Sequence, residues 1–352
     1  MHDIVLITRN DTKQRSSCLP ARMTQLVKKC FFVIPIGIIC NVFFSFAGKE
    51  SDVFRILSHF SPVYFILAIL LSVVPWFTSS ARLYFWSRFI GNSLRYRNVF
   101  KVVLGVELGA AVIPPLIGGG GTKIAMLMYQ GMSGGMALSL TLLESLEDGI
   151  FFILAVPIAL TLALSWDLPV IMHSLESLRQ LSLWVLLVIL CAALLLVMMI
   201  RYRIVFDKLQ RFPYVKAAME RIKPFCQSII ATYSSIIQSG KGIFVLTMAL
   251  TAVSWICRYS LISLLLMSLG ITVQPVPIIS LQVIVFALMT VIPTPGAAGG
   301  AEIIFSLLYR SFLPDGVIGV VTAGWRFLTF YLLLLLASFL LLLLAKKQKG
   351  SR

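Results

Sequence analysis

The sequence has few charged residues, few histidines, and no stretch of polar residues long enough to form the surface of a soluble domain. Charged side chains make up 12% of the 352 residues, whereas 59% are hydrophobic. A soluble globular protein needs far more polar surface than this, so a soluble fold is excluded. The apolar runs are long enough to cross a bilayer, and the chain is therefore predicted to be an integral membrane protein.

Residue patterns typical of metal, redox and nucleotide-hydrolysing sites are also missing. The three histidines and six cysteines are scattered, with no CxxC or HExxH motif, so neither a metal site nor a disulfide framework is predicted. There is no Walker A motif, and no Ser/His constellation that would activate a nucleophile. We therefore predict that the chain needs no cofactor and no metal and is not an enzyme.

Acidic residues are scarce relative to basic ones, 14 against 30, and the basic residues gather at the ends of the apolar runs. This distribution follows the positive-inside rule and does not indicate nucleic-acid binding. In the topology that we predict, 23 of the 30 Lys and Arg residues are cytoplasmic, four lie outside and three lie within the membrane. Both termini are then cytoplasmic, and a bacterial-type inner membrane is the expected location.

The polar segments divide the chain into three parts. Residues 1–30 are predicted to form a basic cytoplasmic arm, residues 31–345 a single transmembrane domain, and residues 346–352 a basic cytoplasmic tail. Within the domain, residues 201–241 form a basic cytoplasmic loop whose interleaved aromatic residues suit the headgroup level of an anionic membrane. The same residues also fit an ordinary solvated loop.

A Pro/Gly-rich stretch inside an apolar segment occurs twice, 179 residues apart, at residues 112–124 and 291–303. The gapless offset matches Pro and Gly at three positions and places Lys123 opposite Glu302. A Pro/Gly break at corresponding positions of two halves is typical of a transporter site near the middle of the bilayer. Two Pro-kinked spanning helices are the simpler alternative.

The two breaks predict two re-entrant hairpins, at residues 99–130 and 276–312, that enter the membrane from opposite faces. The predicted fold is an all-α polytopic helix bundle in which these broken-helix hairpins belong to an inverted repeat. Spanning helices are predicted at residues 31–47, 62–79, 135–164, 181–200, 242–269 and 316–345. The turns are predicted at Pro114, Gly118, Gly120, Gly121, Pro293, Pro295, Gly296, Gly299 and Gly300.

Ionisable residues inside the apolar segments are the main candidates for function, because each costs at least about 2.5–3.5 kcal/mol at a helix centre. The spacing of Glu144, Glu147 and Asp148 places three carboxylates on one helix face. The offset of 179 also aligns Glu147 with Arg326. The full set is Glu107, Lys123, Glu144, Glu147, Asp148, Arg258, Glu302 and Arg326.

We predict that these charges bind substrate and that opposite charges meet across the interface between the halves. The expected pairs are Lys123 with Glu302, and Glu147 with Arg326. Lys123, Arg258 and Arg326 are assigned to an anionic group, whereas Glu144, Asp148 and Glu302 are assigned to a cationic group or to coupled protons, with Glu147 in the same site. Alternatively, the charges are ion pairs that only hold the bundle together.

The motifs resemble the transmembrane, flippase-like domain of lysylphosphatidylglycerol synthases over about residues 25–345. The similar parts are the first broken segment, the Glu144-x-x-x-Asp148 helix, the Pro293-Thr294-Pro295-Gly296 turn with Gly299-Gly300-x-Glu302, and the Trp325-Arg326 helix. The resemblance implies an inner-membrane protein with two re-entrant hairpins that moves a lipid headgroup between leaflets. Because the chain ends at Arg352, we expect a stand-alone member without the soluble aminoacyl-transferase domain.

The predicted function is therefore that of a lipid flippase or transporter for a charged headgroup, carried by a phospholipid, aminoacyl lipid, glycolipid or polyprenyl phosphate. The expected partners are membrane lipids with anionic headgroups, together with a second copy of the chain or a lipid-modifying enzyme. Two alternatives stay open. One is an intramembrane enzyme that uses a carboxylate as general base on a polyprenyl-linked or phospholipid substrate. The other is a membrane scaffold that binds lipid or a partner enzyme through residues 201–223.

Overall fold

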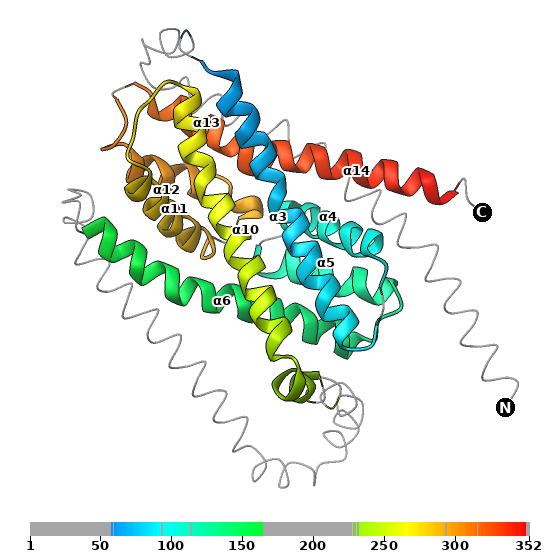
Figure 1. Ribbon diagram of the computed structural model, residues 1–352. Helices are drawn as coiled ribbons and strands as arrows, with labels where there is room; N and C mark the ends of the chain where they lie inside the picture. Colours follow the sequence, from blue (N-terminus) through cyan, green and yellow to red (C-terminus); the bar gives the residue numbers. More distant parts are fainter. Residues whose placement is uncertain are drawn as a thin grey trace, which may run out of the picture.

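The computed structural model describes the central helices of the chain and their connections. The described residues are 58, 60–92, 94–112, 115–164, 227, 230, 232–292, 294–314 and 316–349. They form helices joined by short loops, without any strand, which confirms an all-helical protein (Figure 1). The basic arm, the predicted helices at 31–47 and 181–200, residues 201–226 of the predicted loop, and the turn prolines Pro114 and Pro293 lie outside the described residues.

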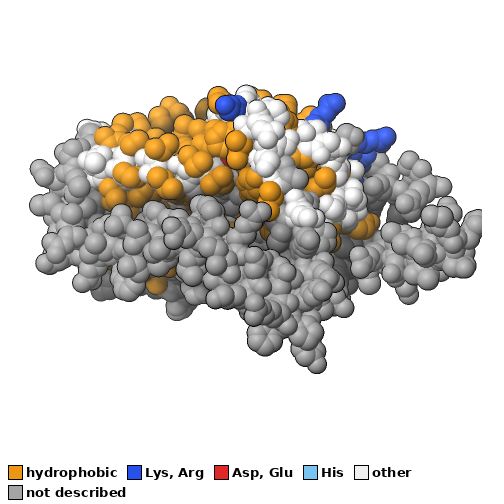
Figure 2. Space-filling model, turned by 90° about the horizontal axis from the view of Figure 1, so that it is seen from below, with side chains coloured by type: hydrophobic (Ala, Val, Ile, Leu, Met, Phe, Trp, Pro, Cys, Tyr) orange, Lys and Arg blue, Asp and Glu red, His pale blue; other side chains and the backbone are white. Residues whose placement is uncertain are grey.

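Four helices of the described part are long and apolar enough to span a membrane. They are α3 (Pro62–Phe89), α6 (Gly134–Leu164), α10 (Lys241–Ser268), and a continuous helix that runs through α13 (Ile318–Arg326), the π-helical segment η2 (Phe327–Tyr331) and α14 (Leu332–Lys349). Figure 2 shows hydrophobic side chains over much of the described surface on one face, with a few Lys and Arg side chains along its rim. Such a surface is stable only against lipid, so the protein is an integral membrane protein.

The predicted spanning helices agree with the structure to within two residues, with one exception. The prediction ended the first described helix at residue 79, whereas α3 continues to Phe89. This extension brings Arg82 and Trp86 into the helix, where both are buried. The hydropathy-based boundary was wrong because the positive charge of Arg82 marks a membrane edge only when that charge has no buried partner.

Two pairs of shorter helices pack beside the long ones and lie on opposite sides of α3 and α10 in Figure 1. The first pair is α4 (Tyr96–Val112) with α5 (Pro115–Tyr129), and the second is α11 (Pro275–Met289) with α12 (Gly300–Tyr309). At about 1.5 Å per residue, none of the four reaches across a hydrocarbon core of roughly 30 Å.

Helices α3 and α10 pack along each other in opposite directions (Figure 1). The backbone N–H of Ser61 donates to the carbonyl of Ser268 over 2.7 Å, so the start of α3 meets the end of α10. At the other end, a Cβ added to Gly240 would lie 3.2 Å from the ring of Phe89. Helix α10 begins and ends 179 residues after α3 begins and ends, and this offset exchanges the two contacts.

The same offset relates the packing of the shorter helices. Helix α4 contacts α3 and α14, whereas its counterpart α11 contacts α10 and α6. Each therefore packs on a long helix of its own half and on the last long helix of the other half. We call α3–α6 the first half and α10–α14 the second half.

The glycine run of the first half lies in a helix. Gly118, Gly120 and Gly121 belong to α5, which begins at Pro115, so these glycines do not form the turn that the sequence predicted. Proline is favourable at the first helical position, because its fixed φ suits a helix and its missing N–H would have no partner there. The break between α4 and α5 therefore comes before the glycines.

Close packing of α4 on α5 stabilises this arrangement. A Cβ added to Gly105 would lie 2.1 Å from the sulfur of Met126, and one added to Gly109 would lie 2.1 Å from the hydroxyl of Thr122. Small residues four positions apart let two helix backbones approach in this way. The pairing of the two helices thus keeps the glycine run of α5 helical.

The second Pro/Gly stretch is not helical. It forms η1 (Pro295–Ala297) and a turn in which Gly296 has φ +60°, Ala297 φ +53° and Gly299 φ +82°. Glycine adopts such left-handed conformations without the steric penalty of a Cβ. Gly300 then begins α12. The two copies of the repeated motif therefore have different conformations.

Candidate functional site

Three carboxylates of α6 form the centre of the charged site. Glu147 is fully buried, the side chain of Glu144 is 9% exposed, and that of Asp148 is 37% exposed. Their spacing over one helical turn brings them to one face, as predicted. Asp148 lies near the midpoint of α6, and the structure therefore places an accessible carboxylate at the middle of a spanning helix.

Arg82 of α3 connects these carboxylates. Its Nε donates to Oε2 of Glu147, its Nη1 to Oδ1 of Asp148, and its Nη2 to the backbone carbonyl of Glu144, each over 3.0 Å. Planar guanidinium groups are suited to such forked arrangements, which use several donors at once. The sequence analysis missed Arg82 by assigning it to the cytoplasm. The apolar and aromatic residues that follow it, Leu83 and Trp86, were the available signal.

Both halves donate hydrogen bonds to the acidic face of α6. Trp86 of α3 donates its Nε1–H to Oε1 of Glu147 over 2.9 Å, and the hydroxyl of Thr247 on α10 donates to the same oxygen. Trp255, also on α10, donates its Nε1–H to Asp148 over 3.2 Å. A buried carboxylate is stable only when its oxygens are bonded in this way. The acidic face therefore ties α6 to both α3 and α10.

Each half contains one ion pair between the second helix of its short pair and the next long helix. In the first half, Lys123 of α5 pairs with Glu144 of α6. In the second half, Nε of Arg326 on α13 donates to Glu302 of α12 over 2.7 Å. Nη2 of Arg326 also donates to the carbonyl of Gly296 over 3.0 Å, which fixes the turn of the second motif.

The two pairs that we predicted across the interface do not form. Lys123 and Glu302 are each paired within their own half, and Glu147 is bound to Arg82 and not to Arg326. The sequence offset aligns equivalent positions of the two halves, but equivalent positions need not be neighbours. Here α5 packs on α6 and α12 packs on α13, so the nearest opposite charge belongs to the same half.

One ion pair of the described residues joins the two halves. Nη2 of Arg258 on α10 lies 3.5 Å from Oε1 of Glu107 on α4, and the two side chains are 26% and 25% exposed. The guanidinium carbon of Arg258 also lies 5.7 Å from the centre of the Trp255 ring. Among the ion pairs of the described part, this contact is the longest.

A neutral chain of buried hydrogen bonds occupies the second half. Trp325 donates to Gln282 over 3.1 Å, Gln282 donates to the hydroxyl of Tyr309 over 2.9 Å, and this hydroxyl donates to the carbonyl of Ile278 over 2.7 Å. The chain connects α11, α12 and α13. It was not predicted, because Gln and Tyr are uncharged and do not stand out in an apolar segment.

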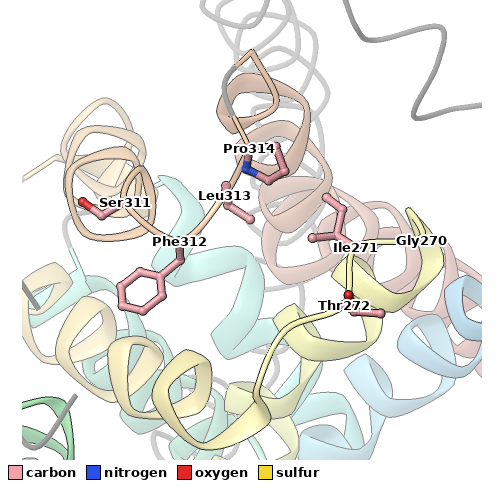
Figure 3. A pocket seen from close by; sticks show the side chains of 7 residues that line it. All are labelled: Gly270, Ile271, Thr272, Ser311, Phe312, Leu313 and Pro314. Carbon is pink, nitrogen blue, oxygen red and sulfur yellow. The ribbon is translucent and has the colours of Figure 1, made fainter. Parts of the chain in front are cut away.

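A pocket of about 470 Å³ lies away from these charges, at the loops that follow α10 and α12 (Figure 3). No ionisable side chain and none of the predicted site residues lines it. The lining residues are Gly270, Ile271, Thr272, Ser311, Phe312, Leu313 and Pro314. The loop pocket is therefore not part of the charged site.

The helices and the charges buried between them define a class of polytopic membrane protein with an ionic centre inside a helical bundle. Within that class, the chain belongs to the family described as the lysylphosphatidylglycerol synthase TM region, whose model matches residues 32–337. It is also similar to a UPF0104 membrane protein of Archaeoglobus fulgidus, with 23% identity over 321 residues that cover 84% of this chain and 92% of that protein. The family membership confirms the resemblance seen in the sequence.

Proposed function

We propose that this protein is a flippase-like transporter that moves a charged lipid headgroup between the leaflets of the membrane. The observation that carries this proposal is the position of Asp148, whose side chain is 37% exposed near the midpoint of a spanning helix. A carboxylate turned toward acyl chains at that depth would cost several kcal/mol. Its exposed side therefore belongs to a space filled by water or by a polar headgroup.

We further propose that the short helix pairs are re-entrant hairpins and that the two halves form an inverted repeat. The supporting observations are the antiparallel packing of α3 on α10, the offset of 179 in their bounds, and the short length of α4, α5, α11 and α12. Inverted repeats with interrupted helices are the architecture on which alternating access is built. The two hairpins would then open the site to opposite sides.

The orientation and the chemistry remain as the sequence indicates. We propose an inner-membrane location with both termini cytoplasmic, because the Lys and Arg residues favour that side. The chain is proposed to transport lipid without transforming it. Lys123, Arg258 and Arg326 are assigned to an anionic headgroup, and Glu144, Asp148 and Glu302 to a cationic group or to protons.

Lipid scrambling by the purified chain in liposomes tests this function. A fluorescent phospholipid in the inner leaflet becomes accessible to a membrane-impermeant quencher only if the protein moves it. We expect the native chain to expose this lipid and Glu302→Gln to lose most of the activity, because the substitution removes the charge that holds Arg326 and the nearby turn. Arg310→Gln, at the exposed end of α12, is the matched control.

Scrambling by Glu302→Gln at the native rate would contradict the role of this ion pair in transport. A lipid product of new mass, formed by the native chain, would instead favour the intramembrane enzyme.

A further inference from the structure

The arginines inside the described helices differ in how their donors are used. Arg82 donates from Nε, Nη1 and Nη2, and its side chain is 4% exposed. Arg326 donates from Nε and Nη2, its guanidinium lies over the rings of Trp325 and Phe330, and its side chain is 2% exposed. Neither can bind a ligand without first losing the contacts that hold its helix.

Arg258 is different. Its one hydrogen bond in the described part of the chain is the 3.5 Å contact from Nη2 to Glu107, and a quarter of its side chain is exposed. Its Nε and Nη1 are therefore open to a further acceptor. A donor–acceptor distance of 3.5 Å is longer than the usual range of about 2.7–3.2 Å, so the contact with Glu107 is weak.

The surroundings hold Arg258 in place for a ligand. Its guanidinium packs over the Trp255 ring, and that ring is fixed by its hydrogen bond to Asp148 and by stacking at 5.7 Å on Tyr259. An aromatic platform of this kind orients the planar group and stabilises its charge. Nearby on α10, Ile256 is 56% exposed, so apolar surface suited to acyl chains lies close to the guanidinium.

We propose that Arg258 binds the phosphate of a lipid headgroup and that the phosphate displaces Glu107. Phosphate oxygens accept two parallel hydrogen bonds from a guanidinium, which is a stronger interaction than the single long contact that they replace. Two anions compete for one cation, so the carboxylate of Glu107 leaves when the phosphate binds. This assignment rests on the proposed function and adds a substrate class to it, lipids that carry a phosphate.

Displacement of Glu107 has a mechanical consequence. Glu107 lies on α4 of the first half and Arg258 on α10 of the second, so their contact joins the halves. Binding of the phosphate breaks this ion pair and releases the α4–α5 pair from α10 at that point. The ion pair thus acts as a latch that the substrate opens.

Binding measured on the purified chain in detergent tests the assignment. A short-chain phosphatidylglycerol is titrated and tryptophan fluorescence is recorded, because Trp255 contacts Arg258. We expect Arg258→Gln to weaken binding about tenfold or more, and Arg258→Lys to weaken it less. We expect Glu107→Gln to strengthen binding roughly threefold or more, since it removes the competing carboxylate. Arg310→Gln is the control that should bind as the native chain does.

The opposite signs for the two partners separate a latch from a structural ion pair. A pair that only stabilises the fold predicts that both variants bind less lipid and unfold at lower temperature. That result, or native affinity in Arg258→Gln, would overturn the proposal. The phosphate-free diacylglycerol and inorganic phosphate are titrated in parallel: competition by inorganic phosphate that depends on Arg258 keeps the site and identifies free phosphate as a ligand, whereas equal binding of diacylglycerol contradicts it.

The scrambling assay distinguishes this proposal from the function on which it rests. Opposite-sign binding effects in a native chain that scrambles no lipid would refute transport and keep the phosphate site. Active scrambling by the native chain, together with unchanged binding and scrambling in Arg258→Gln, would refute the site and keep transport.

Discussion

The two halves of the protein share helix bounds but reverse the sign of their charges. Helices α3 and α10 both have 28 residues and start 179 residues apart. In the first half, the second helix of the hairpin carries the cation Lys123 and the following helix carries Glu144, whereas in the second half Glu302 and Arg326 have the opposite order. The fold therefore requires an ion pair at this contact and does not require a particular sign.

The halves also differ in the conformation of the repeated motif. Gly120 is part of α5, whereas its counterpart Gly299 has φ +82° in the turn before α12. The π-helical segment Phe327–Tyr331 has as its counterpart an α-helical stretch of α6 at residues 148–152. These differences lie close together, because a Cβ added to Gly296 would contact the ring of Phe330 at 2.4 Å. The asymmetry is thus concentrated where the second hairpin touches the last long helix.

The largest expected effect comes from removing the cation that distinguishes the first half. Arg82→Gln leaves Glu147 and the acidic face without their buried partner, and we expect the free energy of unfolding to fall by about 3–5 kcal/mol. Denaturant unfolding in detergent micelles measures this change. Arg88→Gln, six residues further on α3 at an exposed position bonded to Tyr84, is the control and should change stability by less than about 1 kcal/mol. Equal stability of the two variants would mean that the network does not stabilise the fold.

Exchanging charges within the first half tests whether only the presence of the pair matters. Lys123→Glu and Glu144→Lys each place like charges together, and we expect each to lower the free energy of unfolding by about 3 kcal/mol. The double variant copies the sign order of the second half and should recover most of that loss. A double-mutant cycle on the unfolding free energies gives the coupling. Simple addition of the two losses would show that the first half depends on the native order.

The smallest effect concerns the two glycines that occupy equivalent positions. Gly120→Ala should raise the free energy of unfolding by about 0.5–1 kcal/mol, because alanine favours a helix and its Cβ would lie at an ordinary 3.7 Å from Thr141. Gly299→Ala should lower it by about 1–2 kcal/mol, because its positive φ strains any residue with a Cβ. Thermal unfolding of both variants compares the signs, and equal signs would contradict the different conformations of the two motif copies.

Much of the helix arrangement could be predicted from the sequence. The bounds of α6, α10 and the last long helix follow from apolar runs that end at polar residues, and the structure reproduces them to within two residues. The Pro/Gly repeat also located the second turn, since Gly296 and Gly299 need a backbone conformation that other residues avoid. These features are local, so a local pattern is sufficient to predict them.

The features that the sequence did not predict depend on contacts between distant segments. The glycine run of α5 is helical because Gly105 and Gly109 let α4 pack against it, and such a contact leaves no mark within the run itself. Partner choice among the charges failed for a similar reason. Equivalence under the 179-residue offset relates Lys123 to Glu302, but the packing of α5 on α6 gives Lys123 to Glu144.

The burial of Arg82 imposes an order on biosynthesis. Its partner Glu147 is 65 residues further along the chain, so the ribosome delivers α3 to the membrane before the neutralising carboxylate exists. Holding an unpaired arginine in the bilayer core costs about 2.5–3.5 kcal/mol, while the first 18 residues of α3 are already long enough to cross. We therefore expect newly made α3 to sit with Arg82 in the headgroup layer and to slide inward only when α6 arrives.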